Sequence, residues 1–366
     1  MNGISAFKHG GNLYAKMRET GGSLSEILDF SANINPLGMS ERVRQVLYKT
    51  LESVIHYPDA EAYDLKDAIC QHYLVDYEWI TVGNGAVELM YILCHMLAPN
   101  RVLVTAPTFS EYERAARASG AQIEYFYLND SDGFAINIQK LIQQISEVDI
   151  IFICNPNNPT GTLLPHDQVE MLVRAAKMQN TYVVIDESFI DFLPEDSAFT
   201  CRHLLARCDN LILLHSLTKF YAIPGLRLGF SLANPQITLM LHAGKDPWNV
   251  NMLAQHAGAA ALADGPYQQL SREFIAKSKM ELYNDLLTIE GLRPYLPSVN
   301  FVLIKLEKTT ITAGELREIL AGYNILIRDC SNYPGLSSEY IRTAVKETKQ
   351  NAILIETLRT VLGGIE

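Results

Sequence analysis

Short apolar segments alternate with amphipathic segments over roughly the first two thirds of the chain. The apolar segments have the length of buried strands, and the amphipathic ones have the period of helices. The pattern predicts helices at 41–53, 60–72, 85–97, 110–119 and 167–178. It predicts strands at 79–82, 101–105, 122–127, 150–154, 182–186 and 211–216. Such an alternation is typical of an α/β fold with a mostly parallel sheet covered by helices on both faces.

The pattern changes near both ends of the chain, which indicates separate units. Residues 1–38 are rich in Asn, Pro and Gly turns and predict an irregular N-terminal arm with one short helix. Residues 39–248 form the predicted large domain. Residues 249–366 predict a smaller α+β domain, with helices at 252–263, 267–287 and 349–362 and strands at 301–305, 325–328 and 340–343.

Composition and charge exclude several classes of function. The chain has 366 residues, 48% of them hydrophobic, and a net charge of −11 without any block of lysine or arginine. An acidic chain of this kind argues against a nucleic-acid partner or an anionic membrane surface. No window of about 18 apolar residues predicts a membrane span, and no signal peptide is evident, so a cytoplasmic location is expected.

The six cysteines do not suggest a metal site or a disulfide framework. They lie far apart and form no Cys-x-x-Cys pair; Cys201 and His203 are the nearest approach to a ligand pair. Reduced thiols in a cytosolic protein are the simpler interpretation, and no metal is expected.

Candidate chemistry gathers where predicted strands end, which is where ligands bind in open α/β sheets. Asp186 follows four apolar residues at one strand end, and Lys219 lies three residues after Ser216 at another. A lysine that bonds an aldehyde and a carboxylate that keeps a pyridine nitrogen protonated are what pyridoxal phosphate (PLP) requires of a protein. Taken alone, Asp186 is equally consistent with a helix cap or a loop carboxylate.

Further residues at these strand ends suit the other parts of the same cofactor. Ser216, Thr218 and Arg227 can surround its phosphate, together with the turn that contains Gly85 and Ala86 at a predicted helix start. The Asn158 amide can donate to the phenolic oxygen, and Phe109 can stack on the ring. Each has a plainer alternative: an Asn-Pro turn for Asn158 and a core packing role for Phe109.

These motifs resemble the aspartate-aminotransferase superfamily of PLP enzymes, called fold type I. The resemblance runs from end to end and is closest to histidinol-phosphate aminotransferases and to the threonine-phosphate decarboxylases of cobalamin biosynthesis. It implies a large domain with a mostly parallel seven-stranded sheet. Four segments are similar to the decarboxylases at almost every residue: 9–12 (HGGN), 29–38 (DFSANINPLG), 218–229 (TKFYAIPGLRLG) and 332–336 (NYPGL).

The resemblance also implies roles for residues outside the strand ends. Tyr57 is expected to reach the cofactor phosphate of a neighbouring subunit, which implies a homodimer with shared active sites. His9, Asn33, Asn158, Arg328 and Arg342 are expected to bind the phosphate and carboxylate of the substrate. The alternatives are a packing tyrosine before a proline turn and arginines in surface ion pairs.

The expected reaction is decarboxylation of L-threonine O-3-phosphate to (R)-1-amino-2-propanol O-2-phosphate and CO₂, which supplies the aminopropanol linker of cobalamin. The alternative is a histidinol-phosphate-type aminotransferase that uses 2-oxoglutarate. Phe189 favours the decarboxylase, because the aminotransferases usually carry a tyrosine there; a variant without effect on reaction type remains the alternative. Lys219 and Asp186 are the expected catalytic residues in either case.

Overall fold

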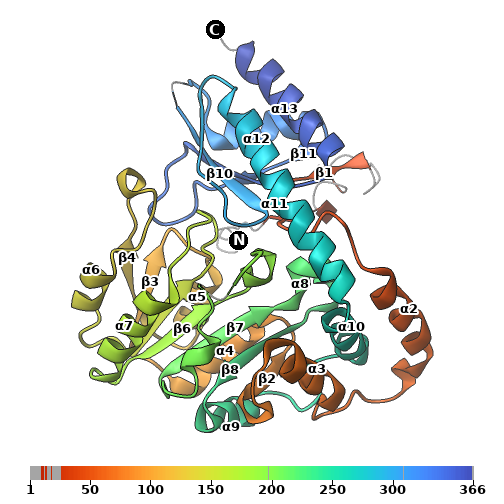
Figure 1. The fold of residues 1–366 in the computed structure, drawn as a ribbon. Helices are drawn as coiled ribbons and strands as arrows, with labels where there is room; N and C mark the ends of the chain where they lie inside the picture. Colours follow the sequence, from red (N-terminus) through yellow and green to blue (C-terminus); the bar gives the residue numbers. More distant parts are fainter. Residues whose placement is uncertain are drawn as a thin grey trace.

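The computed structural model describes residues 10–11, 13–14, 18, 26–196, 198–307 and 309–364. A large α/β unit forms the lower part of the molecule in Figure 1, and a smaller sheet with helices lies above it. Within these ranges no helix is both long and apolar enough to cross a bilayer. Nor do His, Cys, Asp and Glu side chains gather there in threes around a possible metal position.

The large unit is built on a seven-stranded sheet in the order β2-β8-β7-β6-β5-β3-β4. Strands β3 to β7 are parallel to one another, and β8 is antiparallel to both of its neighbours. The strands are β2 (Ile80–Gly83), β3 (Arg101–Ala106), β4 (Gln122–Tyr127), β5 (Ile150–Cys154), β6 (Tyr182–Asp186), β7 (Leu211–Ser216) and β8 (Gly229–Ala233). The expected mostly parallel α/β sheet of fold type I is confirmed.

The six strands expected from the apolar segments are present within one residue of their limits, whereas β8 was missed. Its sequence, GFSLA, has only two large apolar residues and no β-branched residue, so no strand signal stands out. The strand exists because β7 and β2 pair with it on both sides. Tertiary pairing therefore overrides weak local preference.

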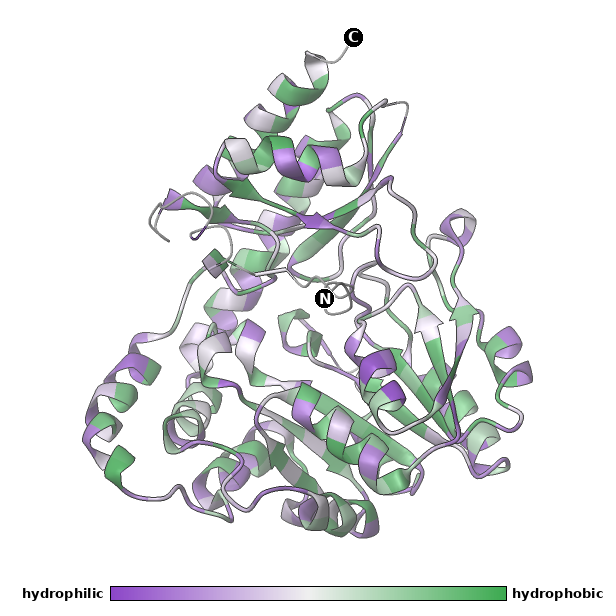
Figure 2. Cartoon of the chain, turned by 180° about the vertical axis from the view of Figure 1, so that it is seen from behind, coloured by the Kyte–Doolittle hydropathy of each residue, from purple (hydrophilic) through white to green (hydrophobic). Residues whose placement is uncertain are grey.

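Helices cover both faces of this sheet, and the parallel strands β3 to β7 contribute alternate residues to two separate cores. Val102 and Val104 pack in one cluster with Leu89 and Tyr112, while Leu103 faces the other cluster. The helices of the large unit are α2 (Glu41–Thr50), α3 (Tyr63–Tyr73), α4 (Ala86–Leu97), α5 (Glu111–Ala118), α6 (Ile138–Gln143), α7 (His166–Lys177), α8 (Leu217–Phe220) and α9 (Pro235–Gly244). Figure 2 shows the hydrophobic strands between helices that are hydrophobic on one side.

The smaller unit has a four-stranded antiparallel sheet in the order β12-β13-β10-β9. Its elements are β9 (Leu292–Pro294), β10 (Phe301–Leu306), β12 (Arg328–Asp329), β13 (Tyr340–Ala344), α12 (Ala313–Gly322) and α13 (Thr348–Gly363). The single strand expected at 325–328 is wrong. It is divided at Ile327 into β11 (Ile325–Leu326), which pairs with β1 (Leu28–Asp29), and β12 in the larger of the two sheets.

Two helices connect the units. α10 (Met252–Leu262) packs against α2 and α3, and α11 (Gly265–Leu287) then reaches β9, β10 and α13. The helix expected at 41–53 ends earlier, at Thr50, and continues as the 3₁₀ turn η2 (Leu51–Ile55). The domain limits after residues 38 and 248 stay a prediction.

Candidate active site

A cavity lies at the carboxyl ends of the parallel strands, as expected for an open α/β sheet. Its walls come from six separate segments of the large unit, which the sheet brings together. The lining residues are Ala86, Val87, Met90, Phe109, Cys154, Asn158, Asp186, Ser188, Phe189, Ser216, Lys219 and Arg227. Seven of the residues expected from the sequence to bind the cofactor are among them.

Lys219 lies in the one-turn helix α8, immediately after β7. Its Nζ donates to Ser216 Oγ at 2.8 Å, and Ser216 Oγ lies 2.7 Å from Thr218 Oγ1. Burial lowers the pKa of Lys219 to about 8, against the opposing effect of the Asp186 carboxylate. A lysine with such a pKa has a substantial neutral fraction near pH 8, which is the form that attacks an aldehyde.

Asp186 ends β6 and is almost fully buried. Its Oδ2 accepts a hydrogen bond from the Tyr112 hydroxyl at 2.6 Å, and its Oδ1 accepts one from the Ser188 N–H at 2.9 Å. Two donors compensate for the removal of this carboxylate from water. Each carboxylate oxygen still has lone-pair capacity for a further donor, such as a protonated ring nitrogen.

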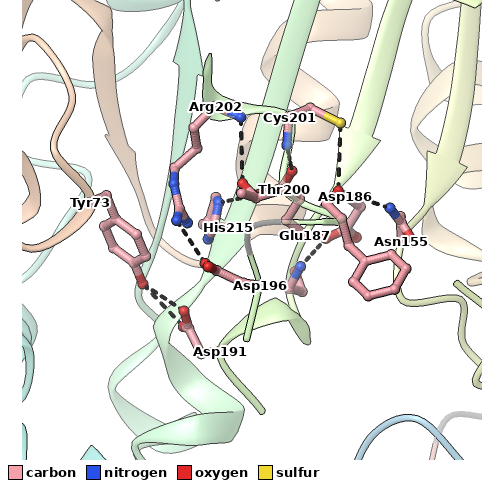
Figure 3. Close-up of polar contacts among 12 residues, drawn as sticks. Tyr73, Asn155, Asp186, Glu187, Asp191, Asp196, Thr200, Cys201, Arg202 and His215 are labelled. Carbon is pink, nitrogen blue, oxygen red and sulfur yellow. Dashed lines mark hydrogen bonds and ion pairs between the residues drawn. The ribbon is translucent and has the colours of Figure 1, made fainter. Parts of the chain in front are cut away.

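A second polar layer lies on the opposite face of the same strand ends (Figure 3). The buried Glu187 carboxylate accepts hydrogen bonds from the Thr200 hydroxyl at 2.9 Å and from the Cys201 N–H at 2.7 Å. His215 Nε2 lies 3.0 Å from the same carboxylate. Because Glu187 follows Asp186 and His215 precedes Ser216, this contact ties the ends of β6 and β7 together directly behind the cavity.

The turn between β2 and α4 forms the end of the cavity that suits a phosphate. Gly85 has a φ of +86°, and a Cβ added to it would lie 2.3 Å from an Arg227 guanidinium nitrogen. Only glycine therefore allows Arg227 to lie against this turn. Ala86 and Val87 are the first residues of α4, whose amides have no partner within the helix. These amides and the guanidinium together suit an anion such as a phosphate.

The Asn158 side chain is oriented by the small unit. Its Oδ1 accepts a hydrogen bond from Arg342 Nη1, so its amide nitrogen is left to donate elsewhere. Arg342 also donates from Nη2 to the Ser31 carbonyl at 2.7 Å. In contrast, the Asn157 side chain stabilises the surrounding loops, because it donates to Pro107 O at 3.0 Å and to Thr160 Oγ1 at 2.7 Å.

Arg328 and Arg342 occupy directly opposed positions on β12 and β13. Both are buried, with 6% and 5% of their surfaces exposed. Burial lowers the pKa of Arg342, and the neighbouring Arg328 adds to this effect. Like charges directly opposite each other destabilise a sheet, and no carboxylate lies within salt-bridge distance of either arginine among the described residues. The pair therefore suits a bound anion.

The remaining expected site residues lie in different places. Thr218 is buried beside Ser216, and Asn33 is buried with its Oδ1 unpartnered. Tyr57 is outside this cavity: it is 77% exposed and its ring lies 4.7 Å from that of Trp248. His9 lies outside the described residues. Arg328 donates to Asn332 Oδ1 at 2.8 Å, within the NYPGL segment.

Four lining residues were not expected from the sequence: Val87, Met90, Cys154 and Ser188. Tyr112, which donates to Asp186 from beside the cavity, was not expected either. Tyr112 follows Phe109 at a spacing of three, which places both on one side of a helix start. Ser188 follows Asp186 at a spacing of two, as on one face of an extended chain. These two spacings were the only sequence signals for Tyr112 and Ser188. They indicate a position at the cavity only once Phe109 and Asp186 are known to face it.

Comparisons with known proteins agree with this geometry. The aminotransferase class I and II family profile matches residues 25–358. The chain belongs to the aminotransferase class I and II family. It is 38% identical to the threonine-phosphate decarboxylase of Salmonella typhimurium over 361 residues, which cover 98% of this chain and 97% of that protein.

Two further similarities come from the same family. Histidinol-phosphate aminotransferase 2 of Ralstonia nicotianae is 32% identical, with 95% of this chain and 92% of that protein covered. The crystal structure of L-threonine-O-3-phosphate decarboxylase from Porphyromonas gingivalis superimposes with a TM-score of 0.82 at 29% identity. The match covers 92% of this chain and 100% of that one.

PLP is the cofactor of this family, and the described residues fit it. Ser188 Oγ and Arg342 Nε are buried beside the site without hydrogen-bond partners, as expected where a polar ligand completes the set. The absence of a Cβ at Gly85 lets the Arg227 guanidinium lie against the turn at the phosphate end of the cavity. Arg227, the α4 amides, Asp186 and Lys219 together match the phosphate, ring nitrogen and aldehyde of the cofactor.

Proposed function

We propose that this family member decarboxylates L-threonine O-3-phosphate to (R)-1-amino-2-propanol O-2-phosphate and CO₂, and that the product supplies the aminopropanol linker of cobalamin. The observation that carries the proposal is the opposed pair Arg328 and Arg342. Two buried guanidinium groups without a carboxylate partner in the described part of the chain suit a substrate with two anionic groups, one of them a phosphate dianion. Arg342 reaches the cofactor cavity through Asn158.

Some of the site residues bind the substrate, and others hold or transfer protons. We assign the substrate phosphate and carboxylate to Arg328 and Arg342, supported by Asn33 and His9. Asp186 would keep the ring nitrogen of PLP protonated, and PLP, when bound there, would supply a sink for the electron pair of the bond broken at Cα. Loss of CO₂ requires one proton at Cα in exchange. Lys219, whose amine titrates near pH 8, returns that proton.

Phe189 supports decarboxylation over transamination. Its ring lies 5.7 Å from Lys219 Nζ and packs edge-on against Phe301 at 5.2 Å. A phenylalanine here offers no hydroxyl to the cofactor, so the oriented Asn158 amide is the donor on that side. The Phe189 ring beside Lys219 also covers the lysine amine.

The test is to incubate the PLP-loaded enzyme with threonine phosphate without a keto acid. CO₂ and aminopropanol phosphate should form at an unchanged rate when 2-oxoglutarate is added. A keto product that forms only with the acceptor would show an aminotransferase instead. Phe189→Tyr serves as the matched variant, because it should retain PLP and makes any gain of transamination measurable.

We propose, further, that the active form is a homodimer with shared active sites. Large apolar side chains are exposed along α2, η2 and the segment up to the start of α3: Tyr48, Leu51, Val54, Ile55, Tyr57 and Tyr63. Trp248, also exposed, packs against Tyr57. A patch of this kind is typical of a protein interface. Tyr57 lies within it, where its hydroxyl can reach the cofactor phosphate of a second copy.

Light scattering should give twice the chain mass of 41.0 kDa. Tyr57→Phe should weaken PLP binding by about 10-fold, the effect of one hydrogen bond to a charged group, without changing that mass. Tyr48→Phe, on the same patch, is the control. A monomer with full activity would contradict the shared site.

We also propose a cytoplasmic location for the protein. The six free cysteines support this location, because the cytosol keeps thiols reduced.

A further inference from the structure

One carboxylate outside the cavity receives an unusual number of donors. Asp130 lies in the 3₁₀ turn η4 (Asp130–Asp132), just after the edge strand β4 of the large sheet. Figure 1 shows this loop rising from β4 toward the small sheet. All four of its side-chain partners belong to the small unit, so the contact crosses from one unit to the other: Arg293, Tyr295, Lys305 and Tyr340.

Both oxygens of the Asp130 carboxylate accept hydrogen bonds from two or more donors. Arg293 Nη2 lies 2.6 Å from both oxygens, Lys305 Nζ lies 3.0 Å from Oδ2, and the Tyr340 hydroxyl donates to Oδ2 at 3.0 Å. The Tyr295 hydroxyl donates to Oδ1. Arg293 also pairs with Glu307 at 2.6 Å, and Lys305 pairs with Glu339 at 3.9 Å, so the two cations of the cluster face three carboxylates.

The cluster keeps its charge across the working pH range. Partial burial opposes ionisation of Asp130, but hydrogen bonds from Arg293, Tyr295, Lys305 and Tyr340 together hold its pKa below the ordinary value. Burial also raises the pKa of Tyr340, which therefore stays a hydrogen-bond donor. Asp130 therefore stays ionised near neutral pH and continues to accept these hydrogen bonds.

Strand register connects this cluster to the arginine pair. Arg293, Lys305 and Tyr340 are opposed residues of β9, β10 and β13, and so form one row across three strands. The row two residues further along the same face contains Leu303, Arg342 and Arg328. Residues separated by two on a strand share a face and lie about 7 Å apart. The row that Asp130 binds is therefore the neighbour of the row that carries both arginines.

We infer that Asp130 is a positioning residue for substrate binding: it fixes the small sheet against the edge of the large sheet and thereby sets where Arg328 and Arg342 stand over the cofactor site. The same face of β13 is then attached to the large unit at two points, Tyr340 to Asp130 and Arg342 to Asn158. This inference rests on the proposed use of the two arginines for the substrate anions.

The test compares Asp130→Asn with Asp132→Asn in the PLP-loaded enzyme. Asp132 is in the same turn, and its exposed side chain contacts Ser131 at 3.4 Å rather than the small unit. Asp130→Asn should raise KM for threonine phosphate about 10-fold, as expected if the binding arrangement is populated about one tenth of the time. It should change kcat and the PLP absorption spectrum little, and Asp132→Asn should match the wild type.

Hydrogen–deuterium exchange supplies a readout that does not depend on the reaction. Asp130→Asn should increase amide exchange in β9 and β13 and leave β5 and β6 unchanged. A KM and a β13 exchange rate equal to those of Asp132→Asn would overturn the inference. If Asp130→Asn does not fold, Tyr340→Phe, which removes one donor of the cluster, decides by the same two measurements. An inactive wild type would refute the proposed function instead. The exchange comparison would still test whether Asp130 positions the small sheet.

Discussion

The two sides of the candidate active site are built in different ways. On the large-unit side, Asp186, Ser216 and Lys219 follow directly from strands β6 and β7, and their polar atoms have partners within the same unit. On the small-unit side, Arg328 and Arg342 are opposed like charges held by carbonyl and amide oxygens. The large-unit side suits a cofactor that stays bound. The small-unit side suits a substrate anion that binds and dissociates in each turnover.

This difference teaches that burial alone does not define a site. Glu187 is as buried as Arg342, yet three hydrogen bonds satisfy it, and it holds strand ends together. The unpartnered Arg342 Nε and Ser188 Oγ mark the positions where a ligand is needed. The following experiments are ordered from the largest expected effect to the smallest, and each tests one side of the comparison.

Lys219→Ala should have the largest effect. Decarboxylation should fall by at least about 1,000-fold, because the variant loses both the amine that bonds the cofactor and the group that returns the proton. CO₂ release measures the loss, and circular dichroism should show an intact fold. Turnover near the wild-type rate would contradict the role of the large-unit side.

Arg342→Gln should reduce kcat/KM for threonine phosphate by about 100-fold or more, since two charge-assisted contacts to an anion are lost. Arg328→Gln should have a smaller effect, about 10-fold, because Arg342 also orients Asn158. Both variants should still bind PLP, which the absorbance of the cofactor measures. If either variant instead loses the cofactor, the division of the site into two sides is wrong.

Tyr112→Phe tests the support of the buried carboxylate. Removal of the 2.6 Å hydrogen bond to Asp186 should reduce kcat/KM about 10-fold, because a hydrogen bond to a charged group contributes about 1.5–3 kcal/mol. A pH titration of the cofactor absorbance should shift as well. Tyr323→Phe, which changes an exposed tyrosine, is the control and should shift neither quantity.

The last experiment measures a different property, the stability of the cofactor-free protein, and not activity. The pKa of Lys219 is lowered to about 8 in the fold but is about 10.4 in the unfolded chain. Between these values the unfolded chain binds more protons, so the free energy of unfolding should rise with pH by about 1–3 kcal/mol from pH 8 to pH 10. Lys219→Met should lack this rise. An equal pH dependence in both proteins would show that Lys219 is not desolvated.

The sequence by itself determined the large-unit side. Asp186, Ser216 and Lys219 are each next to a strand long enough and apolar enough to be recognised, and parallel strands bring their carboxyl ends together. The tertiary structure alone decided what depends on contacts between distant segments. Examples are the pairing of the glycine-containing β8, the division of residues 325–328 between two sheets, and the 2.6 Å contact of Tyr112 with Asp186.

The opposition of Arg328 to Arg342 and the attachment of Asp130 to a row of three strands belong to the same class. Their partners are separated by between 14 and 210 positions along the chain. Local periodicity carries no information over such distances, because it reports only which face of an element is buried. Strand register, which is set by packing of the whole sheet, decides which of these side chains meet.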